Sequence, residues 1–149
     1  MTYDETVQIM ILLGGYYGAG KVDPKMMAQA WYLVLKDYDY RIAQVAVINF
    51  AKRDTRDYAS FPTVGKIVQA IEAESKARSK PIREIKMAIS YGRQYDQLPD
   101  DCKRLISKAD YDSWLSMDAE EFEKRSGVLV RQLTEGAEVE DHRRLSASA

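Results

Sequence analysis

A length of 149 residues suits one domain, or a compact domain with an additional helical arm, and a hydrophobic content of 46% is enough for a core without disulfide or metal cross-links. A formal net charge of −1 argues against a general nucleic-acid coat protein, and the longest apolar runs are too short to cross a bilayer. With one cysteine and an acidic N-terminus unlike a secretory signal, we expect a protein of the cytoplasm.

Helical periodicity dominates the first half of the chain. Helices are expected over about residues 4–13, 24–36 and 40–52, and the first is expected to end at Gly14-Gly15, because glycines often follow a last helical turn. A fourth helix carries the clearest apolar stripe, which consists of Val64, Ile67, Val68 and Ile71. These elements predict a small N-terminal helical bundle.

The second half is expected to form a separate helical segment. Residues 72–80 are polar and predict a hinge, and Pro81 is expected to begin the next helix. A final helix is expected after the capping pair Asp118 and Glu121, and the charged, then Ser/Ala-rich, sequence beyond Gly136 predicts disorder. The predicted fold class is all-α. Its expected parts are a scaffold domain over 1–80, a partner-binding helical segment over 81–135 and a disordered tail over 136–149.

The motifs that usually carry chemistry are incomplete in this sequence. Gly15–Lys21 matches the start of a phosphate-binding loop, but Val22 stands where Ser or Thr would hold magnesium, and the segment leaves a predicted helix instead of a strand. His142 and Cys102 are the single residues of their types and cannot supply a four-ligand zinc site. We interpret Cys102 as a small buried residue. The sequence therefore predicts no catalytic residue, cofactor or metal, and a protein that is not an enzyme.

Tyrosines interleaved with basic residues in the first half raise the alternative of nucleic-acid binding. Aromatic rings can stack on single-stranded bases while basic groups neutralise phosphates. The competing interpretation is that the rings cover a small core and leave their hydroxyls in water. Under the nucleic-acid interpretation, the predicted contacts are Lys52, Arg53 and Arg56.

Short motifs follow one another in a recognisable order along most of the chain. In the first half they are Trp31-(x3)-Leu35-(x)-Asp37-(x2)-Tyr40 and Phe61-Pro62-Thr63-Val64-(x2)-Ile67. In the second half they are Ala88-Ile89, Leu98-Pro99-(x3)-Lys103, Trp114-Leu115 and the segment Phe122–Leu133. This order resembles the bacteriophage replicative-helicase loader and inhibitor family, the adaptor proteins of phage replisomes. The Gly-rich first loop and Thr63-Val64 depart from the family pattern, and neither departure removes a catalytic group, because the family has none.

The resemblance implies a replication adaptor of the host bacterial cytoplasm. Such a protein binds the hexameric replicative DNA helicase, inhibits its ATPase and unwinding, and delivers it to the phage initiator bound at the origin. The N-terminal domain would be the scaffold, and residues from about 82 to 135 would form the helicase-binding arm. Two alternatives stay open: a nucleic-acid-binding phage replication protein, and an inhibitor of the host helicase loader. Direct nucleic-acid binding is not expected to dominate.

The predicted partner-binding residues lie in the last part of that arm. They are Trp114, Phe122, Leu129, Val130, Arg131 and Leu133. The alternative for the apolar members is that they pack the second half onto itself. Arg131 is the best single candidate for an exposed anchor, since arginine is enriched in protein interfaces.

Overall fold

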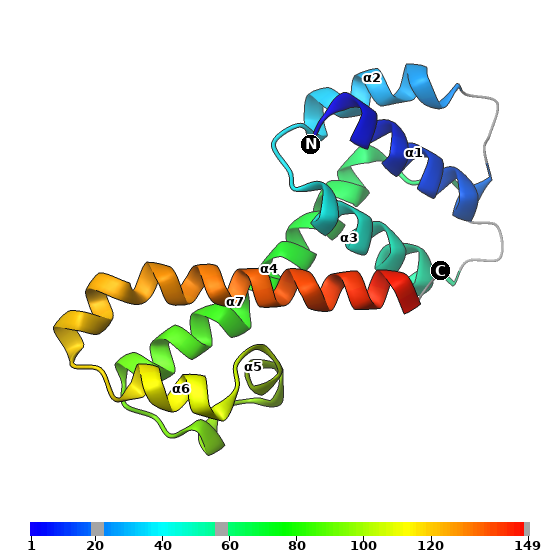
Figure 1. Cartoon of the computed structure of the whole chain (residues 1–149). Helices are drawn as coiled ribbons and strands as arrows, with labels where there is room; N and C mark the ends of the chain where they lie inside the picture. Colours follow the sequence, from blue (N-terminus) through cyan, green and yellow to red (C-terminus); the bar gives the residue numbers. More distant parts are fainter. Residues whose placement is uncertain (19–22, 56–59, 148–149) are drawn as a thin grey trace. The chain divides into compact units, whose positions relative to one another are not determined.

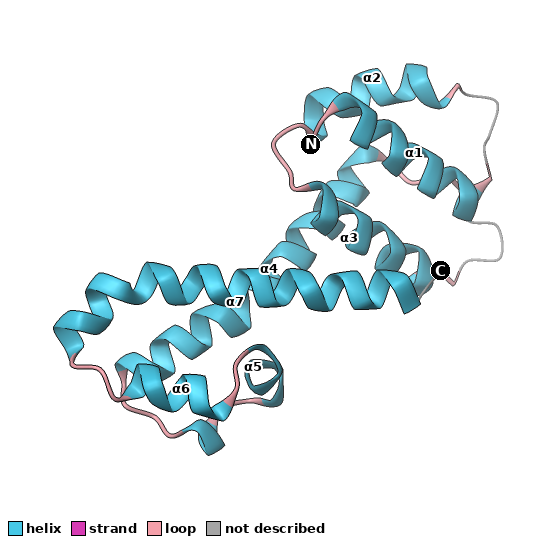
Figure 2. Cartoon of the chain, in the orientation of Figure 1, coloured by secondary structure: helices cyan, strands magenta, loops and turns pink. Residues whose placement is uncertain are grey.

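The protein is described by a computed structural model that covers residues 1–18, 23–55 and 60–147. Every regular element within these ranges is a helix, and the remaining described residues are loops and turns (Figures 1 and 2). The predicted all-α class is therefore confirmed. None of the described helices combines the length and the hydropathy of a membrane span.

The chain divides into two compact units, Met1–Ser75 and Lys76–Ala149, which we call unit 1 and unit 2. The division falls within the long helix α4 (Val64–Ser90), so each unit contains part of that helix. The sequence places this boundary after residue 80. The two units have separate hydrophobic cores and are described one at a time.

Unit 1 contains α1 (Tyr3–Tyr17), α2 (Pro24–Leu35), α3 (Tyr40–Arg53) and the first part of α4. The starts of the first three helices are set by side chains that accept backbone N–H groups, as N-caps do. Thr2 and Glu5 form a reciprocal capping box, and the Asp23 and Asp39 carboxylates accept hydrogen bonds of 2.9 Å from the N–H two residues later. These caps explain why helices begin where the sequence predicts them.

The core of unit 1 is built from aliphatic side chains and small residues at helical spacing. Its buried members are Ile9, Met10, Leu13, Ala28, Trp31, Leu35, Ala43, Ala46, Val47, Ile67 and Ile71. The alanines of α2 and α3 let neighbouring helices approach closely, because ridges of side chains pack into the grooves that small residues leave. The predicted stripe of α4 supplies the last two members.

The predicted end of the first helix at Gly14-Gly15 is wrong. α1 continues to Tyr17, and the chain leaves it at Gly18, whose positive φ of 79° suits glycine. The last turn is held by tertiary contacts: the Tyr17 hydroxyl donates to Asp54 at 2.9 Å, and its ring packs near Phe50. These contacts outweigh the low helix propensity of the two glycines.

Unit 2 contains the rest of α4, the short 3₁₀ helix η1 (Tyr95–Gln97), α5 (Asp100–Leu105), α6 (Lys108–Leu115) and α7 (Ala119–Ala147). Its core combines aliphatic side chains of α4 and α7 with aromatic rings of the shorter elements. The buried members are Ile82, Ile85, Ala88, Ile89, Leu98, Cys102, Ile106, Tyr111, Trp114, Phe122, Leu129 and Leu133.

The predicted helix start at Pro81 is wrong, because α4 runs through this proline and through the polar stretch before it. A proline inside a helix lacks the N–H for the hydrogen bond to the carbonyl four residues earlier and is usually costly. Here the proline is buried, and the following residues Ile82 and Ile85 face the core of unit 2. Packing of this face therefore keeps the helix continuous.

The predicted tail does not begin at Gly136, since α7 continues as a helix to Ala147. A Cβ at Gly136 would lie 3.8 Å from the carbonyl oxygen of Leu105, so α5 approaches α7 closely at this point. The next residue, Ala137, is buried. Contacts on this face, together with many residues of good helix propensity, extend the helix beyond the predicted limit. Residues 148–149 of the predicted tail lie outside the described residues.

Candidate partner-binding surface

Four of the six predicted partner-binding residues lie in the core of unit 2. They are Trp114, Phe122, Leu129 and Leu133. The rings of Trp114 and Phe122 pack edge to face, with centroids 6.3 Å apart. A partner cannot reach these side chains in this conformation. Val130 is half-buried against the same core, and Arg131 is exposed on the outer side of α7.

The predicted nucleic-acid contacts are placed in part. Lys52 and Arg53 are exposed in the last turn of α3, where positive charge complements the helix dipole, and Arg56 lies outside the described residues. The neighbouring tyrosines do not form a stacking platform. The hydroxyl of Tyr38 donates to Glu72 at 3.0 Å, and that of Tyr40 accepts from Gln44 at 2.8 Å.

The incomplete chemical motifs gain no further ligand in the described part of the chain. In the phosphate-loop-like segment Gly15–Lys21, the first residues form the last turn of α1, and the last three lie outside the described residues. The side chain of His142 lies outside them too. Glu84 and Asp101 lie close to the buried Cys102, but burial, followed by these two carboxylates, raises the pKa of the thiol to about 12. The thiol is therefore neutral at physiological pH and donates to Glu84 Oε2 at 3.6 Å.

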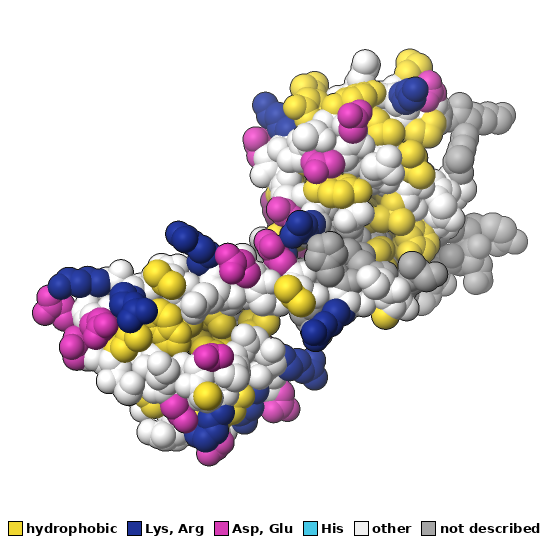
Figure 3. Space-filling view, viewed as in Figure 1, with side chains coloured by type: hydrophobic (Ala, Val, Ile, Leu, Met, Phe, Trp, Pro, Cys, Tyr) yellow, Lys and Arg dark blue, Asp and Glu magenta, His cyan; other side chains and the backbone are white. Residues whose placement is uncertain are grey.

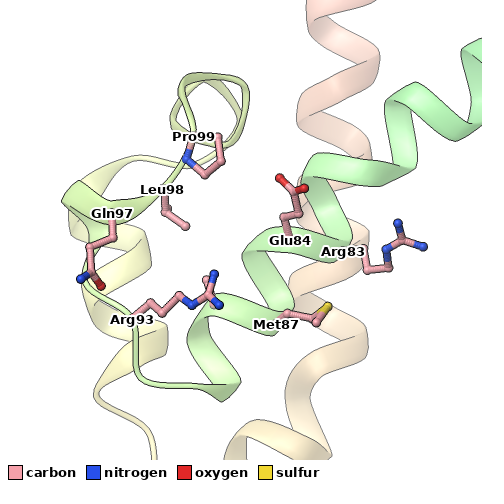
Figure 4. Close-up of a pocket in the computed structure, with 8 residues that line it drawn as sticks. Arg83, Glu84, Met87, Arg93, Gln97, Leu98 and Pro99 are labelled. Carbon is pink, nitrogen blue, oxygen red and sulfur yellow. The ribbon is translucent and has the colours of Figure 1, made fainter.

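An open groove in unit 2 was not predicted from the sequence. It has a volume of about 380 Å³ and lies between the last turns of α4 and the segment that precedes α5 (Figure 4). We call it the α4–α5 groove. The residues that line it are Arg83, Glu84, Met87, Ala88, Arg93, Gln97, Leu98 and Pro99. Ala88 and Leu98 are buried at its base, whereas Met87 is 47% exposed.

The turn at the end of α4 positions one side of this groove. Gly92 has a positive φ of 65° and donates its N–H to Ile89 O at 3.0 Å, while the N–H of Arg93 reaches back to Ala88 O at 2.9 Å. This pair of hydrogen bonds is a Schellman motif, which ends a helix at a glycine. The Tyr111 hydroxyl of α6 then donates to Arg93 O at 2.8 Å and fixes the chain after the turn.

The segment from Gln94 to Leu98 is held in place by further hydrogen bonds. The side chain of Gln97 accepts the backbone N–H of Gln94 at 3.0 Å, and the Tyr95 hydroxyl donates to Ile106 O at 3.2 Å. The rings of Tyr95 and Tyr111 pack edge to face at 5.7 Å. The groove is therefore a formed feature of unit 2, since both of its walls are fixed by contacts with the core.

Two arginines give the groove its charge. Arg93 extends across the space between α4 and Leu98, and Arg83 extends from α4 at the other margin (Figure 4). Neither forms an ion pair with a carboxylate among residues 1–18, 23–55 and 60–147, and the Arg93 guanidinium lies 5.9 Å from the ring centroid of the exposed Tyr91. Glu84 has partners already, because Lys80 lies 3.9 Å from one carboxylate oxygen and the Cys102 thiol donates to the other.

Unit 1 exposes apolar side chains of a different kind. α2 buries Ala28, Trp31 and Leu35 on one face, yet Met26 and Leu33 on the outer face are 73% and 70% exposed. A helix that is apolar on two faces usually has a neighbour on both. Hydrophobic side chains reach the surface over the unit that contains α1 and α2 (Figure 3).

The comparison with known families concerns unit 1. Residues 1–68 match the family described as the gene 39 protein, N-terminal domain. This family is of the phage helicase-loader or helicase-inhibitor type. No curated protein and no solved structure matches the chain. The match covers α1, α2, α3 and the beginning of α4, and it ends before unit 2.

The family match gives the chain a coarse functional assignment. It indicates a phage helicase-associated protein and implies an interaction with a replicative helicase. The matched helices provide the core of unit 1 and the exposed apolar side of α2. The α4–α5 groove and Arg131 lie beyond the matched residues.

Proposed function

We propose that this chain is a phage DNA-replication adaptor that binds the hexameric replicative helicase, inhibits its ATPase and unwinding, and delivers it to the initiator bound at the phage origin. The observation that carries the proposal is the match of residues 1–68 to a helicase-associated phage family. The adaptor would act in the cytoplasm of the host bacterium.

The arrangement into two units supports an adaptor. Each unit has its own core, so each can present a surface without relying on the other for stability. The surfaces also differ in chemistry: the outer side of α2 is apolar, whereas the α4–α5 groove combines an apolar base with two arginines. A protein that contacts a helicase and an initiator needs two such surfaces.

We also propose that the protein acts through binding and not through catalysis. The Cys102 thiol, which is the most nucleophilic type of side chain in the sequence, is buried and held neutral by its surroundings. Its neighbours Glu84 and Asp101 raise its pKa instead of lowering it, which is the opposite of what an activated thiol requires.

Co-elution of the full chain with the cognate hexameric helicase, in ATP and in ADP, tests the proposal. We expect a mixed peak and a fall in helicase ATPase and unwinding as the chain is added. Addition of the origin-bound initiator should restore unwinding. Separate elution under both nucleotides would contradict the proposal, and binding to the host's helicase loader instead would favour an inhibitor of that loader.

A single-stranded DNA arm separates the adaptor from a nucleic-acid-binding protein. Phosphate contacts release counterions, so binding through Lys52 and Arg53 would weaken steeply as salt rises. The adaptor proposal expects weak DNA binding and no change in helicase binding when both residues are replaced by glutamine. Tight, salt-sensitive DNA binding that these substitutions remove would favour the alternative.

A further inference from the structure

We propose that the α4–α5 groove binds a short segment of the helicase that carries an apolar side chain next to one or two carboxylates. This inference rests on the proposed function and assigns the contact that unit 2 makes. Its basis is the apolar base of the groove, the two arginines beside it and the fixed conformation of its walls.

The apolar base has the size and exposure of a side-chain pocket. A volume of about 380 Å³ lies at the lower end of the range for ligand sites, which suits one or two side chains and not a whole helix. Leu98 and Ala88 close the base, and Met87 projects beside them with 47% of its surface exposed. Methionine adapts its shape to an inserted apolar group, because its unbranched side chain rotates freely.

The charges beside the groove favour an acidic partner. Arg83 and Arg93 have no carboxylate partner in the described part of the chain, and an arginine can hold a carboxylate with two parallel hydrogen bonds. The nearby acids are engaged elsewhere. Glu84 contacts Lys80 and Cys102, and the Asp101 carboxylate accepts the N–H of Cys102 at the start of α5.

The composition of the surface agrees with a protein partner. Tyrosine, methionine and arginine are the types enriched in protein interfaces, and Tyr91, 69% exposed beside Arg93, adds an aromatic ring. The backbone of Arg93 is held by Tyr111, and η1 is held by its own capping bonds. A partner therefore binds without first ordering this wall, which lowers the entropic cost of association.

The experiment compares charge-reversal variants of the full chain for binding to the purified hexameric helicase. The double variant Arg83→Glu/Arg93→Glu should bind at least about tenfold more weakly, with a smaller dependence on salt than the wild type. Arg93→Lys should lose less, since lysine keeps the charge but not the paired hydrogen bonds. Met87→Asp should weaken binding through the apolar base. Arg104→Glu, an exposed arginine of α5 outside the groove, is the matched control and should bind as the wild type does.

The outcomes separate this inference from the proposed function. Wild-type affinity in the double variant and in Met87→Asp, with thermal unfolding unchanged, would overturn the groove contact while the adaptor function stands. The same conclusion follows if Arg131→Glu weakens binding and the groove variants do not. Failure of the wild-type chain to bind the helicase would overturn the proposed function and, with it, this contact.

Discussion

The cores of the two units are built on different principles. Unit 1 packs aliphatic and small side chains that recur at helical spacing, such as Leu13, Leu35 and Ala46. Unit 2 places the rings of Tyr111 and Trp114 at its centre, although the helix that supplies both is only eight residues long. Regular amphipathic helices specify unit 1, whereas unit 2 depends on a few large side chains and on the hydrogen bonds they make.

This difference has a functional counterpart. In unit 2, the Tyr111 hydroxyl is bonded to the backbone of Arg93, so one side chain links the core to the α4–α5 groove. In unit 1, the most exposed apolar residues, Met26 and Leu33, lie on the side of α2 opposite its buried stripe. A change in the core of unit 2 should therefore reach its proposed binding surface more directly than a change in the core of unit 1.

The largest expected effect comes from Tyr111→Ala. Removing a fully buried ring leaves a cavity and should destabilise unit 2 by about 3–5 kcal/mol. Tyr111→Phe is the matched control and should cost about 1 kcal/mol, because only the hydrogen bond to Arg93 O is lost. Chemical denaturation followed by fluorescence measures both, since each unit contains one tryptophan, Trp31 or Trp114. An equal shift in the Trp31 transition would show that the units do not unfold separately.

Leu13→Ala tests the same comparison from the other side. Leu13 is fully buried in unit 1, and its truncation should cost about 2–5 kcal/mol. The loss should appear in a Trp114→Phe background, where Trp31 reports on unit 1, and should spare the transition reported by Trp114 in a Trp31→Phe background. Helicase binding through the α4–α5 groove should persist at temperatures where unit 2 remains folded. A shift of both tryptophan signals together would contradict two separate cores.

Much of unit 1 could be predicted because local signals and tertiary packing agree there. Asp23 and Asp39 cap helices at the expected positions, and the stripe that includes Ile67 and Ile71 faces the core. The misplaced end of α1 arose where they disagree. Gly14 and Gly15 favour a break, but contacts made by Tyr17 extend the helix by another turn.

The site in unit 2 could be predicted only in part, for a different reason. Spacing on the last helix correctly groups Phe122, Leu129 and Leu133 on one face, but spacing alone does not distinguish a core from an interface. The α4–α5 groove depends on a hydrogen bond between Tyr111 and Arg93, which are far apart in sequence. Gly92 followed by a basic residue was the one local signal of the turn that forms it.

A third prediction concerns alkaline pH and unit 2. Below pH 9 the Cys102 thiol is protonated in both the folded and the unfolded chain. Because its folded pKa is raised to about 12, the unfolded chain loses this proton first as pH rises, and the stability of unit 2 should fall from pH 9 upward. One group contributes at most about 1.4 kcal/mol per pH unit. Denaturation at pH 8 and pH 10 should show a steeper loss for the wild type than for Cys102→Ala; parallel losses would contradict it.

Pro81→Ala tests the continuity of α4. Proline inside a helix costs about 3 kcal/mol, and replacing it restores a donor for the backbone hydrogen bond. The substitution also removes two buried methylene groups, each worth about 0.8 kcal/mol. The net expectation is a gain of roughly 1 kcal/mol in the Trp114 transition. A loss of stability would mean that packing of the proline ring contributes more than the missing hydrogen bond.

The smallest effects compare matched glycines in the two units. Gly15 in α1 and Gly127 in α7 lie inside helices, and a Cβ at either would meet no atom within 4 Å. Each substitution to alanine should stabilise its own unit by about 0.5–1 kcal/mol, because alanine has the higher helix propensity. Gly92→Ala should instead destabilise unit 2 by about 1 kcal/mol, since its φ of 65° strains any residue with a Cβ. It should also weaken helicase binding, because the Gly92 turn positions Arg93 beside the groove; unchanged binding with lowered stability would show that the turn holds the fold and not the contact.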